Sequence, residues 1–194
     1  MSLRRALGTH LACPLLLCGV ALAAASASQA PPAAVADEEI PEYVVKAGFL
    51  FNLAKYVAWP DPAFPSTSAP IQIGIVGNDP FGPALDQTLA QKSVHNRAFE
   101  IHRFPEVADI RSVHILFVPR SESSRVAQIL NLVEKMPVLT VGEQAGFAAH
   151  GGMVAIIIEG QKPSLHINRT AVERQHLAVD SKLLRVATIV GAEP

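Results

Sequence analysis

The stretch Tyr43 to Pro60, YVVKAGFLFNLAKYVAWP, decides the fold of this chain. At 3.6 residues per turn, the apolar residues that share one face are Val45, Phe49, Leu53 and Tyr56. Other apolar residues, which widen this face or lie on the far side, are Leu50, Val57, Val44, Phe51 and Trp59. A helix that is apolar nearly all round must be covered by its own sheet, by a partner or by both. We expect it to end at Trp59-Pro60, because the residue before a proline is pushed out of the helical region.

Two polar residues interrupt this apolar surface. Lys46 falls within roughly 20° of Leu53 and Val57 on the helical wheel. Asn52 lies between Val45 and Trp59 in the same projection. These positions indicate either deep packing or a site of association, and the sequence leaves both open.

The N-terminus has the pattern of an export signal. Arg4 and Arg5 precede an apolar run from Leu11 to Ala24, and Ala25-Ser26-Ala27 is a small-x-small cleavage site. We therefore expect residues 1–27 to be a cleaved secretory signal peptide. Residues 28–40, SQAPPAAVADEEI, are typical of a flexible leader, and residues 41–191 are expected to form a single α/β domain. The predicted location is the periplasm.

Composition excludes several classes of protein. Both cysteines, Cys13 and Cys18, lie inside the signal, so the mature chain has no disulfide and no thiolate metal ligand. Cys18 follows Leu17, where a lipoprotein signal has a small residue. Loss of the signal lowers the 16 basic residues to 14 against 17 acidic ones, a net charge of −3, so a nucleic-acid partner is not expected. No second apolar stretch is long enough to span a bilayer.

Beyond the first helix, strand and helix patterns alternate. Alternating or continuously apolar segments predict strands at 71–76, 98–104, 113–118, 138–141, 153–158 and 164–168. Helices are predicted at 81–90, 121–134, 170 to about 177, and 182–190. The expected caps are Asp79 before Pro80, Ser121, Thr170 with Glu173, and Asp180 with Ser181. This order predicts a three-layer α/β/α sandwich with a mostly parallel sheet of about six strands, ending in an antiparallel hairpin.

The residues do not indicate an enzyme. The segment GIVGNDPFG is neither G-x-G-x-x-G nor a P-loop and is explained by a tight strand-to-helix turn. The alternative is that the turns at Gly77 and Gly142 line a crevice at the carboxyl ends of the strands. His102, His114 and His166 alternate with apolar residues, which is typical of edge or core histidines. No serine lies in a nucleophile elbow, and we expect neither a metal nor a cofactor.

Five motifs in order resemble the YfiR-like family. They are KAGFLFNLAKYVAWP, IGIVGNDPFG, HILFVPRS, MPVLTVGEQAGFAAHGGMVAIIIE and INRTAVERQHLAVDSKLLRVATIV, and they span roughly residues 43–190. The resemblance implies a small periplasmic α/β protein that represses a membrane-bound diguanylate cyclase by binding its periplasmic region, which lowers cyclic di-GMP and disfavours biofilm formation. Other relatives imply a different membrane sensor or a transport system as the partner.

The chain departs from the family pattern at two positions. Better-known members carry disulfide-forming cysteines where this chain has Gly74 and Val113. The redox-controlled release that the resemblance implies therefore cannot operate through disulfides here. A homodimer is a further expectation, because family members self-associate and the apolar surface exceeds what one sheet needs.

Two functions from different classes follow. The first is a non-enzymatic regulator that binds a membrane signalling protein, and the alternative is a periplasmic small-molecule-binding sensor. The candidate partner- or ligand-binding residues are the polar groups of the first helix and those of the hairpin and C-terminal helices. They are Lys46, Asn52, Lys55, Glu159, His166, Asn168, Arg174 and Lys182. For each of them, a local salt bridge, a cap or a solvated side chain is the competing explanation.

Overall fold

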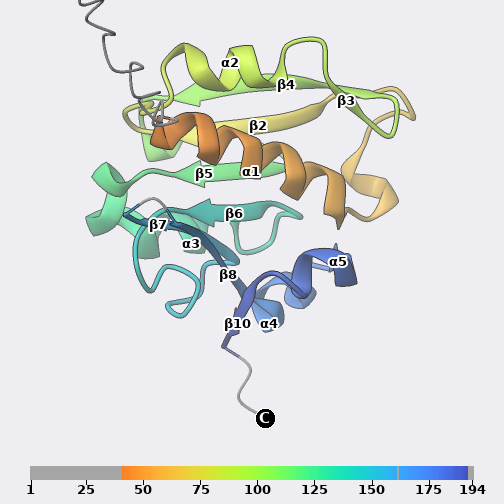
Figure 1. Ribbon diagram of the computed structural model, residues 1–194. Coiled ribbons are helices and arrows are strands. Elements are labelled where there is room, and N and C mark those ends of the chain that lie inside the picture. The colour runs from red at the N-terminus through yellow and green to blue at the C-terminus, as the bar shows by residue number, and fades with distance from the viewer. Residues whose placement is uncertain (1–40, 161, 192–194) are drawn as a thin grey trace, which may run out of the picture. The chain divides into compact units, whose positions relative to one another are not determined.

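A mostly parallel sheet forms the middle layer of the computed structural model, which describes residues 41–160 and 162–191 (Figure 1). Within those ranges the main sheet has eight strands. Their spatial order is β10 (Thr188–Val190), β8 (Lys162–Asn168), β7 (Val154–Glu159), β6 (Leu139–Gly142), β5 (Ile115–Val118), β2 (Ile71–Val76), β4 (Arg97–Phe104) and β3 (Ser93–Val94). The described residues all belong to the unit Glu38–Pro194. The predicted signal peptide and leader, residues 1–27 and 28–40, lie outside them.

The strand pairing confirms the predicted fold class. Strands β4, β2, β5, β6 and β7 run parallel to one another, and β7 then turns back antiparallel into β8. The two strands of this sheet that the sequence did not predict lie at its edges. β3 pairs antiparallel with β4, and β10 pairs parallel with β8. Both are two or three residues long, too short for an apolar pattern to be recognised.

Helices cover both faces of the sheet. On one face, α1 (Glu42–Tyr56), α2 (Pro83–Leu89), α4 (Arg169–Arg174) and α5 (Ser181–Leu184) pack on alternate strand residues such as Ile73, Ile75 and Phe117. On the other face, α3 (Val126–Val133) packs on the intervening residues, including Leu116 and Val118. Figure 1 shows α1 lying across the front of the sheet and α3 behind it. Along each central strand, successive side chains therefore enter two separate cores.

Helix α1 is shorter than predicted and presents a different face to the sheet. It ends at Tyr56, because Val57–Ala58 forms a short strand, β1, that pairs antiparallel with Ala178–Val179, or β9. The residues that it buries are Lys46, Ala47, Leu50, Leu53 and Ala54. The predicted stripe was wrong at Val45, Phe49 and Tyr56, which are only half-buried and flank the contact. The helical wheel fixes relative angles, but packing against the sheet selects the face.

The helices predicted at 81–90 and 121–134 begin later in the structure than expected. α2 begins at Pro83, and the Asp79 carboxylate instead accepts a hydrogen bond from the backbone N–H of Phe81 at 2.8 Å. The segment after β5 starts as a 3-10 helix, Arg120–Arg125, before α3 begins at Val126. In both places the first turn is tighter than an α-helix, which local patterns do not distinguish.

Of the N-caps predicted for the two C-terminal helices, one is wrong and one is confirmed. Asn168, rather than Thr170, caps α4 by accepting a hydrogen bond from the N–H of Ala171 at 2.9 Å. The predicted cap Asp180 is confirmed, since it accepts from the N–H of Lys182 at 2.7 Å. However, α5 ends at Leu184, and Thr188–Val190, which were predicted to continue it, form β10 instead. Pairing with β8 supplies backbone hydrogen bonds that compete with the helix.

Among the helices of residues 41–160 and 162–191, none combines the length and the apolar character that crossing a bilayer requires.

Candidate functional site

A buried cluster of charges lies beneath the N-terminal half of α1. Lys46 is completely buried, and its ammonium group donates hydrogen bonds to the carboxylates of Glu42 and Glu143. Glu143 is 2% exposed and also accepts a hydrogen bond from the backbone N–H of Arg120 at 2.6 Å. The ring of Tyr43 lies 4.6 Å from the Lys46 nitrogen. This arrangement places a buried lysine against a buried carboxylate, which is the condition under which a charge is tolerated in a core.

The cluster lies at the carboxyl ends of the parallel strands. Glu143 directly follows β6, and Arg120 follows β5 after one proline. The Tyr43 hydroxyl is 3.5 Å from Glu143. Burial, followed by the negative charges of Glu143 and Glu42, raises the pKa of Tyr43 to about 12. Tyr43 therefore stays protonated at neutral pH and acts as a hydrogen-bond donor within the cluster.

The crevice expected at this edge of the sheet is filled by side chains of the protein itself. A Cβ atom added to Gly77 would lie 2.1 Å from the Glu122 carboxylate, and one added to Gly142 would lie 2.4 Å from the Phe147 ring. Glu122 is 5% exposed and is paired with Arg125 at 2.7 Å. The space beside Gly77 and Gly142 is therefore taken by Glu122 and Phe147, which favours the tight turn over the alternative of a crevice.

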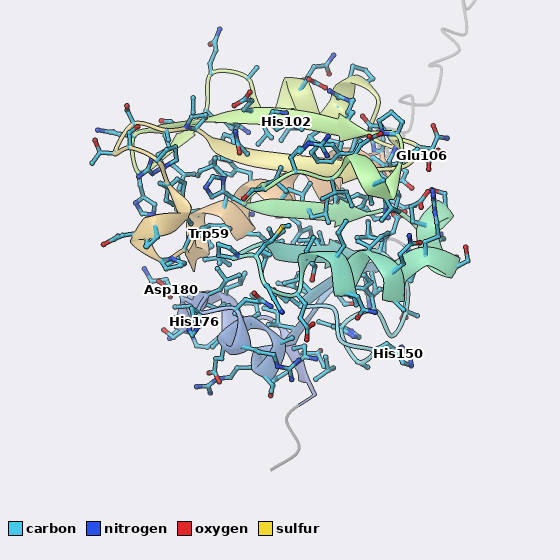
Figure 2. The ribbon with its side chains drawn as sticks, turned by 180° about the vertical axis from the view of Figure 1, so that it is seen from behind. Trp59, His102, Glu106, His150, His176 and Asp180 are labelled. Carbon is cyan, nitrogen blue, oxygen red and sulfur yellow. The ribbon has the colours of Figure 1, made fainter. Side chains whose placement is uncertain are left out.

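A hollow lies at the opposite end of α1. It is an open groove of about 440 Å³, within the range of about 300–1,000 Å³ that is usual for small-molecule sites. The end of α1, both strands of the small β1–β9 sheet, the Phe64 loop and the β3–β4 turn form its walls. Its polar and aromatic lining residues are Lys55, Tyr56, Trp59, Phe64, His95, Arg97 and Asp180. Figure 2 shows Trp59 and Asp180 at this end of the molecule.

Several polar groups of the groove also hold its wall in place. Arg97 donates hydrogen bonds to the carbonyl oxygens of Ser66 at 2.9 Å and Ala69 at 2.8 Å, and its guanidinium lies 3.8 Å from the centre of the Phe64 ring. The indole N–H of Trp59 donates to the carbonyl oxygen of His114 at 3.1 Å. Lys55 lines the groove from α1 and is exposed. The groove therefore combines aromatic walls with the cations Lys55 and Arg97 and the carboxylate of Asp180.

The structure distributes the eight candidate residues over separate places. Lys46 belongs to the buried cluster, and Lys55 lines the groove. Arg174 lines a smaller hollow of about 220 Å³ between α3 and α4, together with His150. Asn168 is buried, caps α4 and donates to the carbonyl oxygen of Ala148 at 2.8 Å, so both ends of its amide group stabilise the fold.

The remaining four candidates lie on the surface or close to it. Asn52 is exposed on the outer side of α1, and Lys182 is exposed on α5. Glu159 is exposed at the end of β7, opposite Lys162 in the hairpin. His166 is half-buried on β8, between Ala155 and Thr188 in register. The structure does not bring these residues together with Lys46 or Lys55.

The sequence did not indicate the residues that complete the buried cluster and the groove. A lysine among apolar residues signals that a carboxylate must lie nearby, but the chain has 17 acidic residues and no local rule selects Glu143. The groove residues Trp59 and Arg97 come from segments far apart in the chain. The one signal in the sequence that could have indicated this wall of the groove is Trp59, which directly precedes a proline-rich loop.

The histidines of the described ranges lie apart from one another. Among residues 41–160 and 162–191, no group of three or more His, Cys, Asp or Glu side chains could hold a metal ion. Figure 2 shows His102, His150 and His176 in separate parts of the molecule. His114 is buried with both ring nitrogens hydrogen-bonded, as predicted for a core histidine.

The comparisons with known proteins identify a family and a fold. A family model described as YfiR/HmsC-like matches residues 43–188. A conserved domain protein from Vibrio cholerae O1 biovar El Tor is similar in structure, with a TM-score of 0.52 and 12% identity over 78% of this chain and 61% of that one. That likeness shows the α/β fold alone. The ABC domain in complex with L-Trp from Streptococcus pneumoniae has a TM-score of 0.45 and 11% identity over 61% of this chain and 54% of that one, which carries no argument. No curated protein matches.

Proposed function

Because this chain belongs to the YfiR/HmsC-like family, we propose that it is a periplasmic, non-enzymatic regulator that binds the periplasmic region of an inner-membrane signalling protein. In its narrower form, the proposal is that the partner is a diguanylate cyclase, which the chain represses so that cyclic di-GMP falls. The observation that carries the proposal is the family match over residues 43–188, which covers nearly all of the described domain. The export pattern of residues 1–27 supports the location.

The outer side of α1 supports a protein partner. Val44 is 39% exposed on this side, and Phe51 close to it is only half-buried. The polar candidates Asn52 and Lys55 are exposed on the same helix. Apolar groups beside a few polar ones are typical of the centre and rim of a protein interface. We therefore propose that the outer side of α1 contributes to partner binding.

The regulatory role is tested by deleting the gene and restoring it with variants. Deletion is expected to raise cyclic di-GMP in the cell, and the native protein is expected to restore the lower level and to co-purify with the neighbouring membrane sensor. Val44→Glu is expected to fold normally but to lose both effects, because a charge enters an apolar contact. Leu50→Glu, whose native residue is fully buried, serves as the control that fails to fold. Unchanged cyclic di-GMP after deletion, with no membrane partner recovered, would overturn the proposal.

The groove favours the second candidate function, a small-molecule-binding sensor. Its aromatic walls and its cations Lys55 and Arg97 fit a small organic anion with an apolar body. A ligand at 100 times its dissociation constant stabilises the native state by about 2.7 kcal/mol. We therefore expect a screen of anionic metabolites to give thermal shifts of several degrees.

The groove itself can be tested with a matched pair of variants. Ala178→Trp, in the wall of the groove, should abolish the thermal shift, because the added ring occupies the space of the ligand. Asn52→Ala, on the outer side of α1, should leave the shift unchanged. A flat response of the native protein across the metabolites would count against this second function.

A further inference from the structure

Strand β4 leaves part of its outer edge without a partner strand. On its inner side, β2 pairs with it along Phe99–Phe104. On its outer side, β3 pairs only with Arg97 and Ala98. The hairpin between β3 and β4 turns at His95 and Asn96, which both have positive φ angles, and β3 itself has only two residues. Among the described residues, the outer edge of β4 beyond Phe99 therefore has no strand beside it.

Backbone groups point outward from this edge at every second residue. The carbonyl oxygen of Phe104 accepts a hydrogen bond from the N–H of Gly77, which directly follows β2. The backbone of Phe104 and of alternate residues before it therefore faces β2, whereas the N–H and C=O groups of Ile101 and Arg103 face away from the sheet. Within the part of the chain that the structure describes, these outward groups have no hydrogen-bond partner. Such a row of donors and acceptors is matched by the backbone of an extended chain.

A hollow of about 300 Å³ lies between this edge and α2. Phe99 and Ile101 line it from β4, and Leu89 lines it from α2. Phe99 and Ile101 are only half-buried, although they belong to the face of the sheet on which α1 and α2 pack. A strand added beside Ile101 would direct every second side chain toward this face. The hollow therefore offers apolar space at the spacing of the side chains of an extended segment.

The hollow is continuous with the outer side of α1 and carries one unpaired charge. The ring of Phe51 on α1 lies 5.9 Å from the ring of Phe99, and the Lys92 ammonium lies 5.0 Å from the centre of the Phe51 ring. Lys92 lines the hollow, is exposed, and takes part in none of the ion pairs between described residues. The acidic residue of the lining, Asp86, is already paired with Arg103 at 2.5 Å. The unpaired charge of the hollow is therefore positive and complements a carboxylate.

We propose that the β4 edge, which is Phe99–Phe104 with the hollow beside it, takes up an extended segment of the membrane signalling protein as an added strand. The segment carries apolar side chains at alternate positions, which enter the hollow, and a carboxylate that meets Lys92. Hydrogen bonds to the backbone of Ile101 and Arg103 supply affinity, and the alternate side chains supply selectivity. The inference rests on the proposed function, since the partner is the same, and adds the place and the mode of contact.

A second copy of this chain fits the β4 edge less well than a single strand does. If the copy paired through its own β4, it would bring its own α2 with it. Figure 1 shows α2 running beside β4 at this margin of the sheet. Two α2 helices would then meet over one junction, whereas an added segment of a partner meets only one. The other edge strand of the sheet, β10, has only three residues to offer.

Binding of the mature protein to the purified periplasmic region of the neighbouring membrane sensor tests the proposal. Ile101→Pro removes a backbone N–H that has no partner in the free protein, so the fold should persist, as it does for prolines at outward positions of edge strands. The dissociation constant should rise at least about tenfold, because one hydrogen bond is lost and the proline ring obstructs the added strand. Ile101→Val keeps the N–H and is the matched control, which should bind within about threefold of the native protein.

A second pair of variants tests the charge of the hollow. Lys92→Glu should raise the dissociation constant about fivefold, because it places a carboxylate where the segment brings its own. Lys135→Glu makes the same change of charge at an exposed position after α3 and should leave binding unchanged. Equal binding by the native protein and Lys92→Glu would contradict the carboxylate assigned to the segment.

Failure of this inference can be told from failure of the proposed function. If the native protein, Ile101→Val and a folded Ile101→Pro all bind the sensor equally, the β4 edge is overturned and the proposed function stands. If the native protein binds no membrane sensor, both are overturned. Circular dichroism of each variant shows whether it is folded.

Hydrogen exchange of the native protein decides should Ile101→Pro not fold. The amide protons of Ile101 and Arg103 should exchange at least about tenfold more slowly in the complex than in the protein alone. The amide proton of His102, which faces β2, is the internal control and should be protected in both states (Figure 2). Unchanged exchange at Ile101 and Arg103 in a complex that has formed would overturn the proposal. Protection that appears in the chain alone and grows with its concentration would assign the edge to a second copy and would also overturn it.

Discussion

Lys46→Met is expected to destabilise the protein by about 3–5 kcal/mol, because it leaves the carboxylate of Glu143 buried without its counter-charge. Methionine fills nearly the same volume as lysine, so the cost arises from the unpaired charge and not from a cavity. Glu42 cannot replace the missing partner, since it carries the same sign as Glu143 and is partly exposed. Denaturant unfolding followed by circular dichroism measures the free energy of unfolding.

A double variant separates the ion pair from the packing. Glu143→Gln keeps an oxygen that accepts the hydrogen bond from the N–H of Arg120 while removing the buried charge. Lys46→Met combined with Glu143→Gln should therefore recover most of the lost stability, as expected for a buried pair replaced by neutral groups. Lys55→Met, an exposed position of the same helix, is the matched control and should change stability by less than about 0.5 kcal/mol. Strictly additive losses in the double variant would contradict the pairing.

Gly142→Ala is expected to destabilise the protein by about 1–3 kcal/mol through overpacking. The new methyl group would lie 2.4 Å from the Phe147 ring, and that ring cannot retreat, because Gly152 confines it on another side. A Cβ atom at Gly152 would meet the same ring at 2.2 Å. The φ angle of Gly142 is not in the left-handed region, so the cost is one of space. Each kcal/mol lowers the melting temperature by about 2–4 °C for a domain of this size.

The clash with Phe147 can be identified by rescue. Phe147→Leu replaces the ring with a smaller side chain, so its combination with Gly142→Ala should cost less than the sum of the two single variants. Gly48→Ala is the control, and it is expected to raise the stability of the protein instead of lowering it. Gly48 lies inside α1 with no atom within 4 Å of an added Cβ, so alanine should stabilise the helix by about 0.5–1 kcal/mol. Equal melting temperatures for Gly142→Ala and the native protein would show that the ring moves freely.

Much of the architecture could be predicted because its signals are local. The apolar run 71–76 coincides with β2, and the segments around 153–158 and 164–168 form the antiparallel pair β7–β8. Alternation with helices gave the parallel order, since parallel strands need a crossover. Short elements were the exceptions. β1, β3, β9 and β10 have two or three residues each and exist because a partner strand lies beside them.

The candidate site was predictable only in part. The sequence drew attention to Lys46 as a charge on apolar surface, and to Lys55 on the same helix. It could not show that one is sealed against Glu143 while the other lines a groove with Trp59 and Arg97. Asn168 was selected as a contact residue, although its amide is used by the α4 cap and by Ala148. Such assignments depend on which distant backbone groups come within hydrogen-bond reach.

The amino-acid sequence by itself determined the class of fold, the central helix and strands, and the family, because hydrophobic periodicity and motif order are properties of neighbouring residues. The tertiary structure alone decided which face of α1 meets the sheet and where the helix stops. It also decided which carboxylate neutralises Lys46 and how His114 holds the groove wall. The Trp59–His114 and Lys46–Glu143 contacts join residues that are 55 and 97 positions apart. Contacts of that separation are fixed by the packing of whole layers, on which the local pattern carries no information.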